Sequence, residues 1–311
     1  MMKIKISIII PFFNEQENIP DLVSRLNEFC ESNAHIAFEI IFVNDGSNDS
    51  SFELIKGYKN LKFSGRLINL ARNFGSHSAL RAGITLATGD LITFLYADLQ
   101  DPPEIINELI VKIDEGNEIV WAHRKSSDIK GMEKLFSALY SRMMRKFALS
   151  NYPEKGFDIV MFTRKVKDQL DLNVESNSSV FLQILNFGFK QSFIEYHRHE
   201  RQKGKSKWTI AKKIKLIIDS FVSFSYFPIR MVSVIGILMF LIGFAWSVYI
   251  VLRTLLYHDL SPGWPTLISI IMLGFGVTNI ALGIIAEYLW RTLDSARKRP
   301  AFIIDKIVDL N

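Results

Sequence analysis

The sequence contains one cysteine, Cys30, among 311 residues, which excludes an intramolecular disulfide framework and a zinc site built from several thiolates. Charged residues are also scarce for a water-soluble enzyme, at 22% against 49% hydrophobic residues, and the mean hydropathy is +0.16. This balance excludes a disordered chain and predicts that part of the protein contacts lipid. The 37 Lys and Arg outnumber the 32 Asp and Glu, so we expect a mildly basic surface.

Two further kinds of signal are missing. The chain reaches Pro11 without the long apolar region and small-residue cleavage site of a signal peptide, so residues 6–10 are expected to form a first β-strand. No Gly-x-x-x-x-Gly-Lys loop and no Gly-x-Gly-x-x-Gly fingerprint occurs, so nucleotide phosphates would need another counter-charge. Because a signal peptide is not found, we expect the N-terminal part of the chain to remain in the cytoplasm.

Two uncharged segments, residues 231–252 and 260–286, are long enough to cross hydrocarbon, which takes about 20 residues. Buried core helices are the alternative, but these normally carry a polar stripe, and neither segment has one. Lysines and arginines precede the first segment and follow the second, among them Lys207, Arg230 and Arg291. The positive-inside bias therefore predicts a two-helix transmembrane hairpin over residues 231–290 with both flanks in the cytoplasm.

Apolar runs and helical patterns alternate over the first half of the chain. Continuous apolar runs predict strands that are covered on both faces, at residues 6–10, 39–43, 66–70 and 91–95. Helical patterns separate and follow them, at residues 20–29, 51–58, 76–87 and 103–114. Alternating elements of this kind predict an α/β fold with a mainly parallel sheet.

Two amphipathic helices are expected, one directly before the first membrane segment and one earlier in the chain. Residues 208–227 place an apolar face opposite Lys212 and Lys213 and adjoin the first span, so we favour a position in the headgroup layer over packing on the sheet. Residues 132–147 show a weaker version, for which both locations remain open. The predicted domains are a catalytic domain at 1–205, an interface segment at 206–230, the hairpin at 231–290 and a basic C-terminal tail at 291–311.

Polar residues follow each of the four predicted strands, where an open parallel sheet forms its ligand crevice. These clusters occupy residues 11–15, 44–49, 71–75 and 96–104. Each cluster alone could be turn or capping chemistry, and for Asp101, which precedes Pro102 and Glu104, we favour an N-cap over a functional role. Four clusters on one edge together indicate a binding site.

A carboxylate and an amide oxygen in the last cluster could hold a metal ion. Asp98 and Gln100 are oxygen donors of the kind that Mg²⁺ prefers, and Mg²⁺ keeps positions open for substrate phosphates. From spacing alone, a metal site and a solvated loop are equally consistent with these residues.

Taken together, these clusters resemble glycosyltransferase family 2, with its GT-A nucleotide-sugar fold. The resemblance rests on IIIPFFNE at 8–15, NDGS at 44–47, RNFG at 72–75 and ADLQDPPE at 97–104. Later segments resemble the polyprenyl-phosphate glycosyltransferases, which include bactoprenol glucosyltransferases, the aminoarabinose transferase of lipid A modification and dolichyl-phosphate mannose synthases. These segments are HERQKGKSKW at 199–208, SFSYFPIR at 223–230, the two spans, EYL at 287–289 and KRP at 298–300.

The resemblance implies roles for individual residues. Pro11, Asn14 and Glu15 would line the nucleotide, and Asp45 would contact the uracil or ribose. Asp98 would join the donor site and, with Gln100, bind Mg²⁺ or Mn²⁺; Asp98 and Asp158 are the candidate catalytic residues, with Asp158 near the acceptor. A basic stretch would hold the lipid phosphate, with Arg198, Arg201, Ser206 and Lys207 as its candidate residues.

The sequence also departs from the family pattern. Tyr96 stands where the first Asp of an Asp-x-Asp motif is usual, and Val160 stands where Arg is common. The segment 175–179 lacks an expected arginine. His77 and His197 have no partner pattern, and both are interpreted as structural.

The implied reaction moves one sugar from a UDP-sugar to the phosphate oxygen of undecaprenyl or another polyprenyl phosphate, with inversion, and makes a lipid-linked sugar for a surface glycan or lipopolysaccharide. A lipid phosphate with a second pKa of about 6 is largely ionised at pH 7, so no strong general base is needed. We therefore expect Asp158 to orient the acceptor or balance charge rather than to remove a proton.

The resemblance also implies a location and partners. We expect a multi-pass protein of the bacterial inner membrane with its catalytic domain and both termini cytoplasmic, and no nucleic-acid partner. Family members are often tetrameric, and glycines spaced by seven residues in both spans permit a homo-oligomer. These glycines are Gly236, Gly243, Gly276 and Gly283.

Two other functions remain as alternatives. A processive polysaccharide synthase would need a pore of several spans and usually a Gln-x-x-Arg-Trp motif, and the sequence has neither. A non-catalytic membrane scaffold descended from such enzymes is the second alternative, because Tyr96 replaces an acid.

Overall fold

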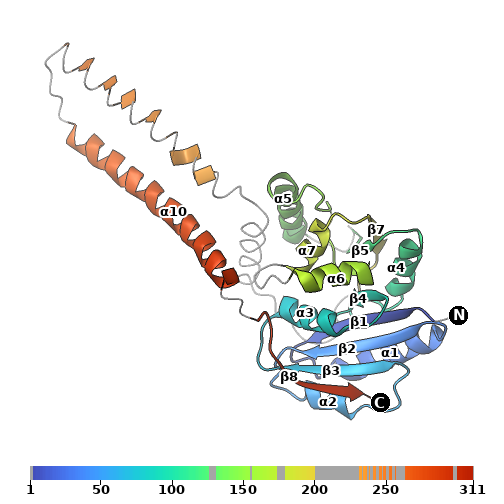
Figure 1. Cartoon of the computed structure of the whole chain (residues 1–311). Coiled ribbons are helices and arrows are strands. Elements are labelled where there is room, and N and C mark those ends of the chain that lie inside the picture. The colour runs from blue at the N-terminus through green and yellow to red at the C-terminus, as the bar shows by residue number, and fades with distance from the viewer. Residues whose placement is uncertain are drawn as a thin grey trace.

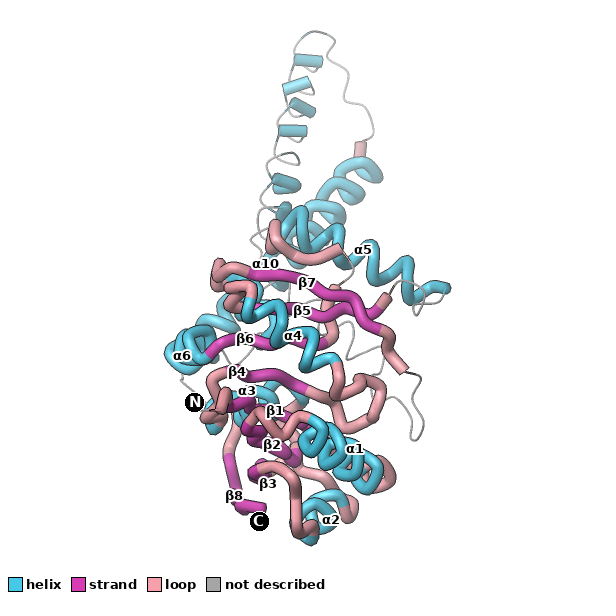
Figure 2. Tube along the Cα trace, turned by 90° about the vertical axis from the view of Figure 1, so that its right-hand side faces the viewer, coloured by secondary structure: helices cyan, strands magenta, loops and turns pink. Residues whose placement is uncertain are grey.

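The computed structural model describes residues 3–125, 131–154, 156–173, 179–199, 263–296 and 300–310, together with individual positions between 231 and 256. Its centre is an eight-stranded sheet in the order β7-β5-β6-β4-β1-β2-β3-β8 (Figure 2). The strands are β1 Lys5–Phe12, β2 Ala37–Asn44, β3 Ser64–Leu70, β4 Leu91–Phe94, β5 Ile119–Arg124, β6 Ile159–Thr163, β7 Gln191–Tyr196 and β8 Ile304–Leu310.

Most neighbouring strands run parallel. β1 pairs in parallel with β2 and β4, β2 with β3, and β5 with β7. β6 is antiparallel to both β4 and β5, and β8 is antiparallel to β3. The carboxyl ends of β1 to β5 and of β7 therefore lie at the same edge of the sheet as the beginnings of β6 and β8. This edge is called the carboxyl edge below.

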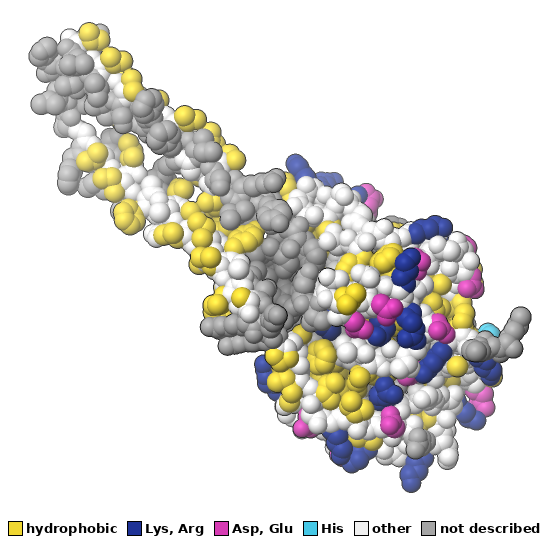
Figure 3. Space-filling view, in the orientation of Figure 1, with side chains coloured by type: hydrophobic (Ala, Val, Ile, Leu, Met, Phe, Trp, Pro, Cys, Tyr) yellow, Lys and Arg dark blue, Asp and Glu magenta, His cyan; other side chains and the backbone are white. Residues whose placement is uncertain are grey.

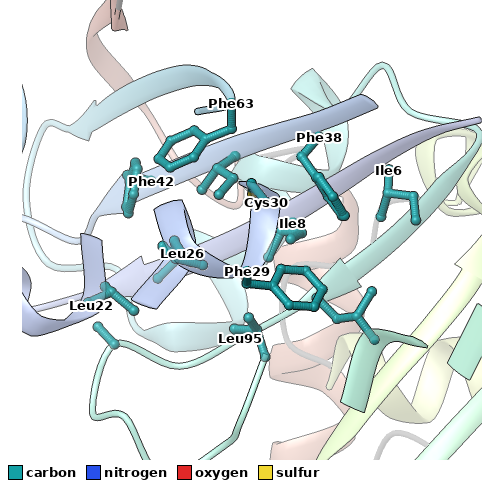
Figure 4. Close-up of a cluster of buried hydrophobic side chains, with 14 of the residues drawn as sticks. Ile6, Ile8, Leu22, Leu26, Phe29, Cys30, Phe38, Phe42, Phe63 and Leu95 are labelled. Carbon is teal, nitrogen blue, oxygen red and sulfur yellow. The ribbon is translucent and has the colours of Figure 1, made fainter. Parts of the chain in front are cut away.

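Helices cover both faces of the sheet (Figure 1). The described helices are α1 Ile19–Ser32, α2 Ser51–Gly57, α3 Ser76–Leu86, α4 Ile105–Asp114, α5 Gly131–Phe147, α6 Arg164–Leu172, α7 Val180–Asn186 and, outside this cover, α10 Trp264–Ala296. Residues of α1, α2 and α4 share one buried apolar cluster, which Figure 4 shows in part. Residues of α3, α5, α6 and α7 share a second cluster on the opposite face.

The continuous isoleucine run of β1 follows from this two-sided cover. Ile8 and Ile10 belong to the first cluster and Ile9 to the second, and all three are fully buried. Gly83 allows α3 to approach this strand closely, since a Cβ at that position would lie 2.3 Å from Ile9 Cγ2. The prediction of a mainly parallel α/β sheet is confirmed, as are the four predicted strands and the four helices between and after them.

The structure corrects the prediction for the C-terminus. Residues 291–311 were expected to form a basic tail, but residues 304–310 form β8 and pair with β3 from Gly65↔Leu310 to Leu70↔Ile304. The segment was not predicted as a strand because its charged residues hide the apolar pattern. These residues occupy exposed positions that face solvent at the edge of the sheet. Residues 304–310 are therefore part of the sheet domain.

The long helix α10 extends away from the sheet (Figure 1). It has 33 residues and exposes large apolar side chains along its length, including Ile271, Phe275, Ile280 and Leu289. Figure 3 shows this apolar surface beside the more highly charged surface of the sheet domain. In the parts of the chain that the structure describes, no helix combines the length and the apolar character needed to cross a membrane.

The other predicted membrane elements are described only in part. The amphipathic segment 208–227 lies outside the described residues, and the first predicted span is described only at individual positions. The second amphipathic segment is a helix, α5. In its C-terminal half Met144 is buried, while Tyr140, Met143 and Phe147 pack against the second apolar cluster and Leu139 is exposed. Packing on the sheet domain therefore accounts for much of this half of α5.

Candidate active site

The loops after β1 and β2 are joined by reciprocal hydrogen bonds at the carboxyl edge. The backbone N–H of Asn14 donates to Ser47 Oγ at 2.9 Å, and the N–H of Asn48 donates to Asn14 Oδ1 at 2.8 Å. The N–H of Glu15 donates to Ser51 Oγ at 2.9 Å. Asn14 has a φ of 52°, a left-handed conformation that asparagine tolerates better than most residues. These bonds bring two of the predicted donor-binding residues, Asn14 and Glu15, next to the second loop.

Pro11, the first of the residues predicted to bind the nucleotide-sugar donor, lies within β1 rather than in the loop. It is buried and stands opposite Val43 of β2. Its predicted contact with a nucleotide stays a prediction, as do those of Asn14 and Glu15.

Asp45 holds the loop after β3. Its two carboxylate oxygens accept hydrogen bonds from the backbone N–H groups of Phe74 at 2.7 Å and Gly75 at 2.9 Å, and the residue is only 4% exposed. The Arg72 guanidinium stacks on the ring of Phe74 at 4.1 Å from its centroid. Asp45 therefore has a structural partner in addition to its predicted contact with a uracil or ribose.

A chain of polar side chains connects the C-terminal strand with these loops. Asn69 Nδ2 donates to Asp305 Oδ2 at 3.1 Å, and Asn44 Nδ2 donates to Asn69 Oδ1 at 2.7 Å. Asn44 Oδ1 in turn accepts the N–H of Ser47 at 3.0 Å. Nothing in the local sequence pointed to Asn69 or Asp305, because the pairing of β8 with β3 brings them together across 236 positions.

The predicted metal residues lie in the loop after β4. Gln100 Nε2 donates to the backbone oxygen of His199 at 3.2 Å. This bond uses the amide nitrogen, so the amide oxygen Oε1 can serve as a metal ligand. Asp98 is half-buried, and its Oδ1 accepts the N–H of Gln100 at 3.3 Å. Two hard oxygen donors fit Mg²⁺ or Mn²⁺. Among the described residues no group of three or more His, Cys, Asp or Glu could hold a metal, so phosphate and water oxygens would have to complete this site.

Asp158 is held by two arginines at the same edge. It immediately precedes β6, and its Oδ2 accepts the N–H of Arg124 at 3.1 Å. Its Oδ1 lies 3.5 Å from Arg124 Nε and 3.6 Å from Arg198 Nη1. The structure therefore brings the predicted acceptor-side acid to the same sheet edge as Asp98.

Asp101 does not cap α4, and the N-cap interpretation was wrong. The N-cap of α4 is Glu104, while the Asp101 side chain is fully buried and contacts Tyr196 and Arg198. Its Oδ1 accepts the Tyr196 hydroxyl at 2.6 Å and lies 3.2 Å from Arg198 Nε. Burial raises the pKa of the Asp101 carboxyl, and the charge of Arg198 opposes that rise. Sequence reasoning missed Tyr196, whose partner lies 95 positions away.

Tyr96 lies among these acids. Burial raises the pKa of its hydroxyl, and the charges of Asp101 and Asp158 add to the rise, so the side chain is a neutral phenol at pH 7. Val160, the other departure from the family pattern, is fully buried in β6.

Among the predicted phosphate-binding residues only Arg198 is described. Arg201, Ser206 and Lys207 lie outside the described residues, as do positions 174–178 of the segment that lacks an arginine. Arg198 already contacts two carboxylates, so its charge is shared within the protein. The binding of a lipid phosphate by these four residues stays a prediction.

The two histidines interpreted as structural both have contacts. His77 packs edge-on against Phe181, with ring centroids 5.7 Å apart. His197 Nε2 lies 3.0 Å from Lys125 Nζ.

The fold and the site together indicate a class of protein. A mainly parallel sheet carries hydrogen-bonded loops at its carboxyl edge, together with Asp98 and Gln100 as a pair of oxygen donors. This is the arrangement expected for an α/β transferase that binds a nucleotide-activated group. Residues 7–170 match the sequence profile of the family described as Glycosyl transferase family 2. The chain belongs to this family and is a glycosyltransferase.

Three similar proteins match the chain over nearly its whole length. An uncharacterized glycosyltransferase, YkcC of Bacillus subtilis (strain 168), is 36% identical over 97% of this chain and 94% of its own. A prophage bactoprenol glucosyl transferase homolog of Escherichia coli (strain K12) is 34% identical over 97% and 99%. The undecaprenyl-phosphate 4-deoxy-4-formamido-L-arabinose transferase of Yersinia pestis (strain Pestoides F) is 32% identical over 98% and 94%.

Proposed function

We propose that this protein transfers a single sugar from a UDP-sugar to a polyprenyl phosphate, with undecaprenyl phosphate as the expected acceptor. The proposal rests on the similarity to relatives named for bactoprenol and undecaprenyl phosphate. This similarity covers both the sheet domain and the C-terminal helical region of the present chain. The product is a lipid-linked sugar for a surface glycan or lipopolysaccharide. The reaction inverts the anomeric carbon by direct displacement.

The donor binds at the loops after β1 to β4. Asn14 and Glu15 border the second loop, and Asp45 with the Arg72–Phe74 pair forms the wall beyond it. The hydrogen bonds among these loops fix their backbones before the donor arrives, which reduces the entropy lost on binding.

Asp98 and the Gln100 amide oxygen would hold Mg²⁺ or Mn²⁺. A bound divalent ion of this kind offsets negative charge on a departing diphosphate. Gln100 is restrained for this role by two hydrogen bonds with His199, because its own carbonyl accepts the N–H of His199 at 2.9 Å. His199 thus connects the metal-binding loop to the basic stretch that follows it.

Asp158 orients the acceptor and balances charge. The acceptor phosphate needs no strong base because it is already largely ionised at pH 7. The contacts of Asp158 with Arg124 and Arg198 agree with this role, since the carboxylate is held in one place by cations. Loss of activity in Asp158→Asn by more than about 10³-fold would instead indicate proton removal, because general-base effects run to about 10²–10⁴.

We also propose that residues 231–290 form a transmembrane hairpin and that the sheet domain lies at the cytoplasmic face of a bacterial inner membrane. The exposed apolar side chains of α10 support this placement. The carboxyl edge supports it further, because the chain leaves that edge after β7 and returns to it at the start of β8. A lipid acceptor held beside the hairpin is then close to Asp98 and Asp158. Arg198, Arg201, Ser206 and Lys207 bind its phosphate. The protein forms a homo-oligomer, and the glycine spacing in the spans permits a tetramer.

A transfer assay tests the proposal. Purified protein in lipid is given labelled UDP-sugars and undecaprenyl phosphate, with and without a chelator, beside an Asp98→Asn variant as control. A monomeric lipid-linked product that requires the divalent ion and Asp98 supports the proposal. A long polymer would indicate a polysaccharide synthase, and no turnover with any donor would indicate a scaffold.

The phosphate grip has its own test. Charge reversal at Arg201 and Lys207 is expected to raise the KM for the lipid phosphate far more than the KM for the UDP-sugar. Equal effects on both would contradict a specific contact with the acceptor phosphate.

A further inference from the structure

The loop after β4 is connected by a compact set of contacts to the end of β7 and the segment that follows it. On one side stand Gln100 and Asp101, and on the other stand Tyr196, Arg198 and His199. Four contacts join them: the two hydrogen bonds between Gln100 and His199, the Tyr196 hydroxyl bond to Asp101, and the ion pair of Asp101 with Arg198. The loop carries the proposed metal ligands, and the segment leads directly into the basic stretch at 200–207.

Arg198 is the shared member of this set. Its Nε lies 3.2 Å from Asp101 and its Nη1 lies 3.6 Å from Asp158, so one guanidinium spans both carboxylates. Asp101 is the fixed end of this arrangement because its side chain is fully buried and also accepts the Tyr196 hydroxyl. Asp158 is more accessible, with a side chain 13% exposed.

We propose that Asp101 is a positioning residue that acts through Arg198 to fix Asp158 and the start of the acceptor-binding segment relative to the metal-binding loop. Asp101 itself touches no substrate in this scheme. The expected effect of replacing Asp101 on sugar transfer rests on the proposed function. The expected effect of the same replacement on backbone mobility does not.

A comparison with Glu39 distinguishes positioning from simple stabilisation. Glu39 is also a buried carboxylate, and it accepts hydroxyl hydrogen bonds from Ser7 and Thr88 and pairs with Lys5. It lies near the beginnings of β1 and β2, at the opposite edge of the sheet. Glu39 is therefore a buried carboxylate with hydroxyl and cationic partners away from the proposed site, which makes it a matched control for Asp101.

The experiment uses the full-length protein in lipid with the variants Asp101→Asn, Arg198→Gln, their double variant, and Glu39→Gln as the matched control. Steady-state kinetics with UDP-sugar and undecaprenyl phosphate give kcat and both KM values. Asp101→Asn is expected to lower kcat/KM for the lipid phosphate by roughly 10–100-fold, because misplacement by about 1 Å can cost that much. The KM for the donor should change less than threefold, and Glu39→Gln should leave both KM values unchanged.

The double variant tests whether Asp101 acts through Arg198. If it does, the double variant should be no slower than Arg198→Gln alone, because the second change removes a contact already lost. Fully additive losses would overturn the proposal.

Hydrogen exchange gives a second readout that needs no turnover. Asp101→Asn should speed amide exchange in peptides that contain Arg124 and His199, whose N–H groups bond to Asp158 and Gln100. Glu39→Gln should instead affect peptides near Thr88, whose N–H bonds to Glu39. Unchanged exchange at Arg124 and His199 would refute the positioning role even in an active enzyme. If exchange changes as expected but wild-type protein transfers no sugar, the proposed function fails and the positioning role stands.

Discussion

Asp305, in the last strand, accepts a 3.1 Å hydrogen bond from Asn69, which lies 236 positions earlier in β3. Through Asn44 this contact continues to Ser47 in the loop that borders Asn14. The end of the chain therefore supports the side of the site that is proposed to bind the donor.

We expect Asp305→Ala to raise the KM for the UDP-sugar several-fold and to leave the KM for the lipid phosphate unchanged. The reason is that Asn69 loses its acceptor and no longer fixes the Asn44 amide. Lys306→Ala is the control, since Lys306 pairs with Asn69 only through the backbone register of β8. Steady-state kinetics measure both effects, and a change confined to the acceptor KM would contradict the prediction.

Asp98→Asn should weaken binding of Mn²⁺ in the absence of any donor, because an amide replaces the one carboxylate of the proposed site. Titration followed by electron paramagnetic resonance gives the affinity directly. Asp49→Asn is a control, because Asp49 is also at the carboxyl edge but is bonded to the backbone of Gln16 and Ser51. Equal Mn²⁺ affinity in Asp98→Asn and wild-type protein would rule out Asp98 as a ligand.

Gly46→Ala should destabilise the sheet domain by at least about 1–3 kcal/mol, because Gly46 has a φ of +69° and a Cβ there would lie 2.6 Å from backbone atoms of Arg72 and Asn73. Gly57→Ala is the matched control, since a Cβ at Gly57 meets nothing within 4 Å. Denaturant unfolding of both variants measures the difference. A Gly46 variant as stable as the Gly57 variant would show that the turn can rearrange.

Glu39 should make the stability of the protein depend on acid pH. Its pKa in the folded protein is lowered from the ordinary value of 4.5, so its contribution is fully present above that value and is lost as pH falls through the folded pKa. Glu39→Gln should therefore reduce the free energy of unfolding near pH 7 by about 1–3 kcal/mol and flatten its decline below pH 4.5. Urea unfolding across this pH range checks both parts. A variant with an unchanged slope would mean that other carboxylates dominate the acid response.

Local sequence patterns predicted the first half of the fold because its strands are apolar on both faces and its helices are regular. No strand was predicted at β5 to β8. β7 and β8 have polar and exposed positions at the two edges of the sheet, whereas β5 and β6 are buried apolar strands that were overlooked. Asp98, Gln100 and Asp158 were found as candidates from motifs. The contacts of Asp101 with Tyr196 and Arg198 were not predictable, because they depend on how β6 and β7 return to the sheet rather than on any nearby residue.

Asp101 shows why a local pattern can mislead. Its position before Pro102 and Glu104 satisfies the preferences for a helix start, yet the helix begins at Ile105 and the carboxylate is buried elsewhere. Tertiary contacts with Tyr196 and Arg198 place this carboxylate, and the capping bond that is given up contributes only about 1 kcal/mol.

The pairing of β8 with β3 also limits how the polypeptide can be made. Since β8 is synthesised after all the other described strands, the flank of β3 stays open throughout synthesis of the intervening helices. The finished sheet then requires the chain to come back to the side from which it departed, so any passage through a bilayer must involve an even number of crossings. We therefore expect insertion of the proposed hairpin to precede closure of the sheet.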